Sequence, residues 1–287
     1  MDLCNIGTIK QLMHDFNIAF KKEYGQNFLI NAKIPERIAD ACCEHSDSVI
    51  LEIGPGIGCL TQKLAQRYKK VIALEIDRGL LPVLSRTLSE FSNISVINED
   101  VMKADIQALL KTEAGDAPIS VCANLPYYIT TPILMKLLES RIAFDFITVM
   151  VQSEVAARLC AGAGEDAYGS ITAVLNYYGT AEKLFSVSAG NFMPAPKVDS
   201  AVVRIKLHKS PPFMLQNEEL FFRIIKAAFE QRRKTLSNAI SGVIPLSKSE
   251  ITDIIASLGH RPDIRGERLA CADFAALANA LSSPLPR

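Results

Sequence analysis

The sequence predicts an α/β fold with a mostly parallel sheet, followed by a small all-helical domain. From residue 48 to about 152, short apolar runs alternate with segments of helical periodicity. Apolar runs without polar alternation are typical of strands buried on both faces, as in parallel sheets covered by helices. After residue 208 only helical periodicity is found. These observations indicate a Rossmann-like sheet domain and a separate helical one.

Five buried strands and their helices make up the predicted sheet domain. The strands are expected at residues 48–54, 70–77, 94–100, 119–126 and 144–152, and the helices at 58–68, from 78 to about 90 and at 130–140. The runs AEKLFSV and SAVVRIKL, at 181–187 and 200–207, predict two antiparallel strands that close one edge.

The C-terminal part begins after a proline-containing linker, HKSPPF, at residues 208–213. The segment 217–233 is predicted to be a helix, because apolar side chains recur at four-residue spacing. Shorter helices are expected at 236–241, 247–258 and 269–281. We therefore divide the chain into a domain at 1–208 and a helical domain at 209–287.

Composition excludes several classes of protein. With 49% hydrophobic and 22% charged residues among 287, the chain can bury a large core. No apolar run reaches about 18 residues, and the N-terminus lacks the apolar core of a secretory signal, so a cytoplasmic protein without membrane contact is expected. Seven Cys without a CxxC pair, and four His, predict reduced thiols and no metal site.

The charge balance is even over the chain but uneven along it. Lys and Arg number 31, as do Asp and Glu, which argues against a simple nucleic-acid binder. Residues 1–195 hold 17 basic and 22 acidic side chains, whereas residues 196–287 hold 14 and 9. This asymmetry is compatible with one face that meets a polyanion.

A glycine-rich turn, LEIGPGIG, follows the first predicted strand. Gly54, Gly56 and Gly58 would let the backbone turn sharply and approach a ligand closely. The spacing differs from the G-x-G-x-x-G of nicotinamide-binding proteins. Read from Glu52, the pattern E-x-G-x-G-x-G instead resembles the first motif of S-adenosylmethionine-dependent methyltransferases. A purely structural glycine turn remains the alternative.

Two acids at the ends of the next strands strengthen the cofactor interpretation. Glu75 ends the second predicted strand, where a carboxylate can accept both ribose hydroxyl hydrogens. Asp100 ends the third, where it can accept a hydrogen bond from an adenine amine. Either residue alone could be a surface acid. Successive strand ends are, however, where open α/β sheets bind ligands.

The fourth strand ends in CANLPYYIT, which predicts a site for an aromatic amine. The side-chain oxygen of Asn124 and the backbone carbonyl of Leu125 could accept the two hydrogens of an adenine N6 amine. Pro126 stiffens the turn, and Tyr127 offers a flat face for an unstacked base. Tyr128 is expected to serve packing only.

Taken together, these motifs resemble those of the ribosomal RNA adenine N6-dimethyltransferases, most closely the bacterial small-subunit type. The resemblance covers about residues 20–280 and also includes GQNFL at 25–29 and FMPAPKVDSAVVRI at 192–205. It implies that S-adenosylmethionine is used to dimethylate two adjacent adenosines in the 3′-terminal hairpin of 16S rRNA. The implied partner is the immature 30S subunit, and a monomer is the default.

The resemblance also assigns roles to single residues. It implies that Asn27 and Leu29 close over the cofactor, and that Phe192 sandwiches the target base opposite Tyr127. A core position is the alternative for Phe192. The cofactor set it implies is Asn27, Leu29, Gly54, Gly56, Glu75, Asp100 and Asn124, and the catalytic set is Asn124, Leu125, Tyr127 and Phe192. Phosphate contacts are considered for Lys21, Lys22, Arg232, Arg233 and Lys234, with solvated surface charge as the alternative.

Three other functions remain open at this stage. The large-subunit relatives that confer macrolide resistance share the Asn-x-Pro-Tyr turn, although they typically have Ile after the Asn. A ribosome-assembly factor without catalysis would keep the fold for RNA binding. A DNA adenine methyltransferase would usually carry Asp at the position of Asn124.

Overall fold

The computed structural model describes residues 1–21 and 25–282, and the chain forms two compact units. One unit contains residues 1–156 and 181–207, and the other contains 157–180 together with the chain from 208 on. The first unit ends at Leu207, within one residue of the predicted domain boundary at residue 208. Residues 157–180 were expected in the sheet domain, whereas in the structure they cluster with the C-terminal helices.

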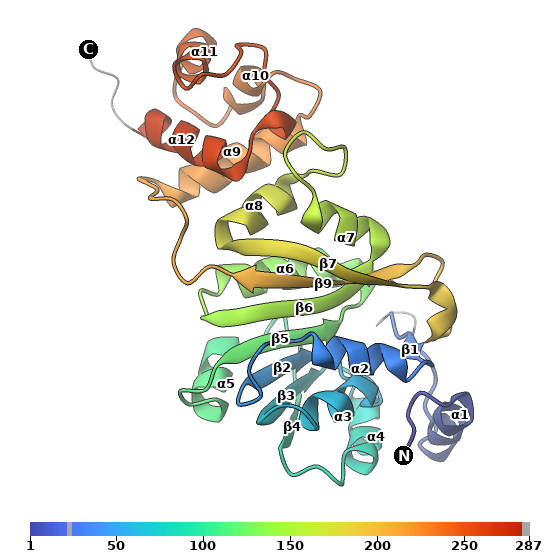
Figure 1. The fold of residues 1–287 in the computed structure, drawn as a ribbon. Coiled ribbons are helices and arrows are strands. Elements are labelled where there is room, and N and C mark those ends of the chain that lie inside the picture. Colours follow the sequence, from blue (N-terminus) through green and yellow to red (C-terminus); the bar gives the residue numbers. More distant parts are fainter. Residues whose placement is uncertain (22–24, 283–287) are drawn as a thin grey trace. The chain divides into compact units, whose positions relative to one another are not determined.

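In the part of the chain that the structure describes, seven strands form the sheet of the first unit. They are β2 Val49–Ile53, β3 Lys70–Glu75, β4 Ile94–Asn98, β5 Ile119–Asn124, β6 Phe144–Gln152, β7 Gly179–Val187 and β9 Ser200–Leu207. Their order is β4-β3-β2-β5-β6-β9-β7, as Figure 1 shows. The strands β2 to β6 are parallel to one another, whereas β9 is antiparallel to β6. The predicted mostly parallel sheet is therefore confirmed.

The sheet is buried on both faces at its centre. All five residues of β2 are buried, because neighbouring side chains point to opposite faces and both faces are covered. Ile53 of β2 is paired with Leu74 of β3 and with Ala123 of β5. The residues that follow these partners consequently emerge at one level, at the carboxyl edge of the sheet.

Among the described residues of the first unit, seven helices begin, and three of them were predicted from the sequence. They are α1 Ile6–Asp15, α2 Lys33–Asp40, α3 Cys59–Ala65, α4 Leu81–Thr87, α5 Ile106–Glu113, α6 Thr130–Glu139 and α7 Ser153–Cys160. The predictions for α3, α4 and α6 are confirmed. The helix α1 was missed; Asn5 caps it, and Ile9 and Leu12 join the apolar cluster that contains Leu84 of α4.

The second unit is helical, as predicted. Its helices are α8 Ser170–Tyr178, α9 Glu218–Glu230, α10 Leu236–Ile240, α11 Lys248–Ser257 and α12 Cys271–Ser282. Aromatic contacts explain why α8 belongs here: Tyr177 lies 5.3 Å from Phe221 between ring centroids, and Tyr168 lies 5.5 Å from Phe229. The Tyr168 hydroxyl also donates to the Leu269 carbonyl at 2.9 Å.

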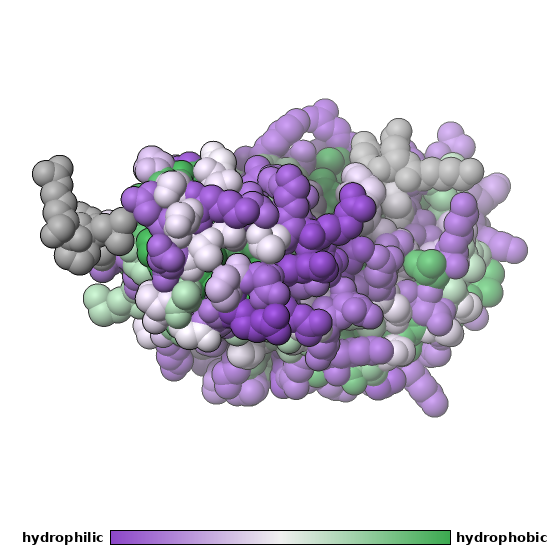
Figure 2. All heavy atoms as spheres, turned by 90° about the horizontal axis from the view of Figure 1, so that it is seen from above, coloured by the Kyte–Doolittle hydropathy of each residue, from purple (hydrophilic) through white to green (hydrophobic). Residues whose placement is uncertain are grey.

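The polar surface, the helices and the cysteines can be compared with what the composition predicts. In Figure 2 most of the visible face is hydrophilic, with small apolar patches between the polar residues. In residues 1–21 and 25–282, no helix has the length and apolar character needed to cross a bilayer. No disulfide joins any of the seven cysteines, all of which lie in the described part of the chain.

A tight contact in the second unit leads to a stability prediction. A Cβ added at Gly266 would lie 2.6 Å from the Cβ of Ala228 in α9, closer than packed carbons approach. We expect Gly266→Ala to lower the free energy of unfolding by about 1–3 kcal/mol, because overpacking displaces the helix. Urea unfolding followed by circular dichroism would measure it.

The matched control is Gly242→Ala, where the added Cβ would meet nothing within 4 Å. This variant should unfold at the wild-type urea concentration. Equal urea midpoints for Gly266→Ala and Gly242→Ala would show that the structure accommodates the added methyl group near Ala228 with no loss of unfolding free energy.

Candidate active site

Four groups singled out in the sequence lie at the carboxyl edge of the sheet. In the order of the strands, they are Asp100 two residues after β4, Glu75 at the end of β3, Gly54 directly after β2 and Asn124 at the end of β5. Because these strands are parallel neighbours, their ends meet along one line. The structure thus brings together residues that are 70 positions apart in the chain, where open α/β sheets bind ligands.

The predicted glycine turn has left-handed backbone angles, which glycine adopts without strain. Gly54 and Gly56 have φ angles of +70° and +61°. A Cβ at Gly54 would meet nothing within 4 Å, so this side of the turn is open. At Gly56 a Cβ would lie 3.3 Å from the Phe28 ring of β1, Phe28–Leu29. The turn is therefore covered on one side and accessible on the other.

The carboxylate of Glu75 is the central acceptor of the site. It is only 4% exposed. Its Oε1 accepts the Asp77 N–H at 2.7 Å, and its Oε2 accepts the Gly56 N–H at 3.2 Å. Burial raises the pKa of Glu75 to about 7, although both N–H donors oppose the rise. Each oxygen keeps a second lone pair with which to accept a ligand hydroxyl.

A second acid, Glu52 in the middle of β2, is buried still more deeply. It is 1% exposed, and its Oε2 has no hydrogen-bond partner among the described residues. Burial raises the pKa of Glu52 to about 8, and the charge of Glu75 adds to the rise. Glu52 is consequently protonated at neutral pH, whereas Glu75 is near its midpoint.

Lys21 and residues 25–27, which we call the N-terminal arm, are bound to the sheet edge through Asp77. The Asp77 carboxylate accepts hydrogen bonds from Lys21 Nζ at 2.7 Å and Gln26 Nε2 at 2.9 Å. Burial alone would raise the pKa of Asp77, but Lys21 and the other donors hold it below its ordinary value. Gln26 and Asp77 thus contribute to the site, and sequence reasoning missed both.

The arm also reaches the Asn-Leu-Pro-Tyr turn. The carbonyl oxygen of Asn27 lies 3.5 Å from Nδ2 of Asn124, which can donate to it. This orientation directs the amide nitrogen of Asn124 toward the arm and leaves its oxygen as the acceptor for a ligand. The Leu125 N–H donates to the Met150 carbonyl at 3.1 Å, which fixes the turn to β6.

The two tyrosines of the turn have different environments. The Tyr127 hydroxyl lies 2.7 Å from Oγ of Ser200, the ring is half-buried, and burial raises the pKa of the phenol. Tyr128 was expected to pack, and this prediction is wrong: the side chain is 62% exposed. Pro126 ends β5 early, and Tyr127, Tyr128 and Ile129 then form a short 3₁₀ turn.

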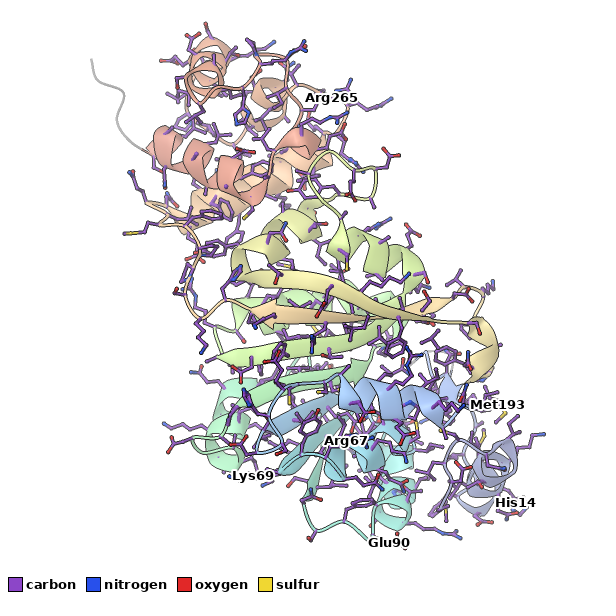
Figure 3. All side chains as sticks on the ribbon, viewed as in Figure 1. His14, Arg67, Lys69, Glu90, Met193 and Arg265 are labelled. Atoms are coloured by element: carbon purple, nitrogen blue, oxygen red, sulfur yellow. The ribbon has the colours of Figure 1, made fainter. Side chains whose placement is uncertain are left out.

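Leu29 and Phe192 are paired across the two short strands β1 and β8, Phe192–Met193. Leu29 is 1% exposed and Phe192 is 3% exposed, and both belong to the same apolar cluster. A base could stack on Phe192 only after a neighbour had moved. Met193, the next residue, is labelled in Figure 3 at this end of the sheet.

Around Asp100 the structure adds two further residues. The strand ends at Asn98, two residues earlier than predicted, and Asp100 begins a turn in which its Oδ1 accepts the Met102 N–H at 2.9 Å. The Asn98 amide donates to the Glu75 carbonyl at 2.7 Å and so ties the ends of β3 and β4 together. Ile76, beside Glu75, is 44% exposed and presents an apolar face at this edge.

The basic residues considered for phosphate binding differ in their partners. Lys21 is bound to Asp77, and Arg232 forms an ion pair with Glu267 at 3.2 Å. Arg233 and Lys234 are exposed. Lys22 lies outside the described residues.

Comparison with known proteins decides which family has this arrangement. A family model of ribosomal RNA adenine dimethylase matches residues 17–259. The chain belongs to this family. The predicted class of enzyme, an RNA methyltransferase, is thereby confirmed, and the family and fold imply S-adenosylmethionine as the methyl donor.

Individual relatives of the dimethylase support this assignment over nearly the whole chain. Ribosomal RNA small subunit methyltransferase A of Geobacillus kaustophilus (strain HTA426) is 45% identical over 98% of this chain and 97% of its own. The protein of the same name from Streptococcus thermophilus (strain CNRZ 1066) is 44% identical over 98% of each chain.

Two solved structures share the fold of this dimethylase. A dimethyladenosine transferase from Plasmodium falciparum has a TM-score of 0.74 and 26% identity, over 87% of this chain and 95% of its own. The 23S rRNA methyltransferase ErmE has a TM-score of 0.70 and 25% identity, over 90% of this chain and 100% of its own. This chain therefore has the same fold as both of these solved structures.

The buried Glu52 makes the stability of the dimethylase pH-dependent. Its pKa is about 8 in the folded protein and ordinarily 4.5, so between these values the folded state binds an additional proton. Stability must then fall as the pH rises. Relative to Glu52→Gln, the wild type should lose up to about 1.4 kcal/mol of unfolding free energy per pH unit between pH 5 and 8.

Urea unfolding of both proteins at several pH values would test this dependence. The exposed Glu44 provides the control, because Glu44→Gln should follow the wild type at every pH. Parallel curves for the wild type and Glu52→Gln would mean that Glu52 is ionised in the folded state.

Proposed function

We propose that the protein dimethylates the N6 amines of two adjacent adenosines in the 3′-terminal hairpin of 16S rRNA, with S-adenosylmethionine as methyl donor. The observation that carries the proposal is the line of strand ends that holds the glycine turn, Glu75, Asp100 and Asn124. The choice of 16S rRNA rests on the relatives of 44–45% identity, which are named as small-subunit enzymes.

The residues at the sheet edge fit S-adenosylmethionine. The two oxygens of Glu75 are positioned to accept the ribose hydroxyls, and Asp100 to accept the adenine amine. The exposed face of Ile76 suits an adenine ring. The open side of Gly54 leaves room for the methionine end, and Asn27 and Leu29 are proposed to close over it. When bound, the cofactor supplies an electrophilic methyl group on a sulfonium.

Asn124 and Leu125 are proposed to activate the adenine amine by orientation. The N6 lone pair is delocalised into the ring, which makes the amine a poor nucleophile. If the Asn124 side-chain oxygen and the Leu125 carbonyl each accept one N–H, the lone pair is directed toward the methyl group. The same oxygens stabilise the positive charge that develops on nitrogen before a proton is released to solvent.

Aromatic residues would hold the base outside its helix. Tyr127 is placed beside Asn124 by the turn, and its hydroxyl is bound to Ser200, so the ring has a defined orientation. Stacking on such a ring offsets the cost of unstacking the base. Phe192 is proposed as the opposite face of the sandwich, which requires that part of its ring become uncovered in the complex.

The second unit is proposed to recognise the RNA around the target. It contains exposed Arg233 and Lys234, and Arg265, which Figure 3 labels on this unit. Because the whole chain has no net charge, little general attraction to bare RNA is available. The immature 30S subunit, whose RNA is already shaped, is therefore the proposed substrate. We propose a monomer acting in the cytoplasm, where subunits are assembled.

One observation argues against each of the three alternative functions. A large-subunit enzyme shares the fold, but Leu125 stands where that group typically has Ile. A purely structural assembly factor would have no use for the complete set of cofactor residues. A DNA enzyme usually has Asp in place of Asn124.

Asn124→Ala tests both the mechanism and the substrate. We expect methyl transfer to small subunits that lack N6,N6-dimethyladenosine to fall by at least about 100-fold, because both orientation and charge stabilisation are reduced. Primer extension on 16S and 23S rRNA reads the product, since dimethylated adenosine stops the polymerase. The wild type should produce a stop in 16S only.

Asn93→Ala is the matched control. Asn93 precedes β4 at the opposite edge of the sheet, and its amide bonds the carbonyls of Ala65 and Tyr68. This variant should lose stability but keep its activity per folded molecule. Full activity of Asn124→Ala would discard the mechanism, and a stop in 23S rRNA alone would discard the substrate.

A further inference from the structure

Ser200, the first residue of β9, contacts a ring that belongs to a turn two strands away. Tyr127 follows β5, and β6 lies between β5 and β9 in the sheet, as Figure 1 shows. The Tyr127 side chain therefore reaches across the end of β6, where its hydroxyl lies 2.7 Å from Ser200 Oγ. Ser200 is fully buried and is paired with Gln152, the last residue of β6. The ring is thus held by the central sheet as well as by its own turn.

The preceding residue, Asp199, is bonded to the turn that leads to Phe192. Its Oδ1 accepts the Ala189 N–H at 2.9 Å. Ala189 begins the 3₁₀ turn Ala189–Asn191, and Phe192 follows that turn directly. The dipeptide at the start of β9 therefore contacts one aromatic residue of the proposed base pocket and the turn that carries the other.

Asp199 is fixed to the same sheet that holds Ser200. Its backbone carbonyl accepts the N–H of Ser153, the residue directly after β6, at 2.9 Å. Burial raises the pKa of the Tyr127 phenol, the bond to Ser200 opposes this rise, and the negative charge of Asp199 adds to it. Both side chains of the dipeptide are therefore close enough to the Tyr127 hydroxyl to affect it.

We propose that Asp199 and Ser200 are positioning residues for methyl transfer, which together fix the two aromatic walls of the target-base pocket. The inference rests on the proposed function, in which Tyr127 and Phe192 stack on the extruded adenine. In-line transfer requires that the N6 amine has a fixed place relative to the methyl group. A base between two rings keeps that place only if neither ring moves relative to the other. A common anchor at the start of β9 meets this requirement.

Removal of the hydroxyl contact from either end tests the first wall. Ser200→Ala and Tyr127→Phe each delete the contact and keep the ring. Methyl transfer to small subunits that lack N6,N6-dimethyladenosine is measured per folded molecule, at varied subunit and varied S-adenosylmethionine concentrations. Each variant should lower kcat about 3- to 10-fold at an unchanged KM for either substrate, because one hydrogen bond that orients the ring is lost. The double variant should be no slower than the slower single variant, because both substitutions delete the same bond.

Two substitutions of Asp199 test the second wall. Alanine removes the acceptor for the Ala189 N–H, whereas asparagine keeps an acceptor oxygen without the charge. Asp199→Ala should lower kcat by a similar factor, and Asp199→Asn should remain within about twofold of the wild type. The matched control is Ser120→Ala in β5: this serine is also fully buried in the sheet, but its hydroxyl has no hydrogen-bond partner among the described residues. The control should keep the wild-type kcat and KM values.

Other outcomes would overturn the proposal in distinguishable ways. A wild-type kcat for Ser200→Ala would show that its hydroxyl does not position the ring, and if that variant does not fold, a wild-type kcat for Tyr127→Phe would show the same. Multiplied effects in the double variant would mean that Ser200 acts through another partner. Equal losses in both Asp199 variants would assign the effect to charge. A higher KM for the cofactor would place the dipeptide on the cofactor side. If the wild-type protein fails to methylate the subunits, the proposed function itself is wrong, whatever the variants do.

Discussion

The Glu75 carboxylate, buried at the end of β3, is the interaction on which the rest of the site depends. It accepts the N–H of Gly56 in the glycine turn and the N–H of Asp77, so it joins two loops that leave neighbouring strands. Because the carboxylate is almost completely withdrawn from water, its pKa rises to about 7. Its remaining acceptor capacity is directed at the cofactor site, where hydroxyl donors would stabilise its charge.

The N-terminal arm connects this acid to the residue that is proposed to handle the substrate. Gln26 is bonded to Asp77, and the Asn27 carbonyl faces the amide of Asn124. Two adjacent residues of one segment therefore contact the proposed cofactor side and the proposed substrate side of the site. A displacement of the arm would disturb both at once, which suits an enzyme that must bring a methyl group and an amine into line.

Burial gives different roles to acids that look alike in the sequence. Burial in the interior of β2, where no described residue bonds its Oε2, raises the pKa of Glu52 to about 8, so it is mostly protonated at pH 7. Glu75 has two N–H donors and a place at the edge. Asp77 is nearly as buried as Glu75, yet it remains charged because Lys21 and Gln26 bind it. Burial acts to raise the pKa of all three acids, and the positive charge of Lys21 beside Asp77 is what keeps that acid ionised.

The sequence by itself determined the strands of the seven-stranded sheet, the glycine turn, the acids at strand ends, the Asn124 turn and the C-terminal helices. These features follow from local periodicity and from residue types with few alternatives. Only the tertiary structure decided that α8 joins the second unit, that Phe192 is buried and that Tyr128 is exposed. Each of these depends on neighbours distant in the chain: the rings of α9, the strand β1 and the arm at Gly25. Sequence spacing carries no information about such contacts, because burial is a property of the assembled fold.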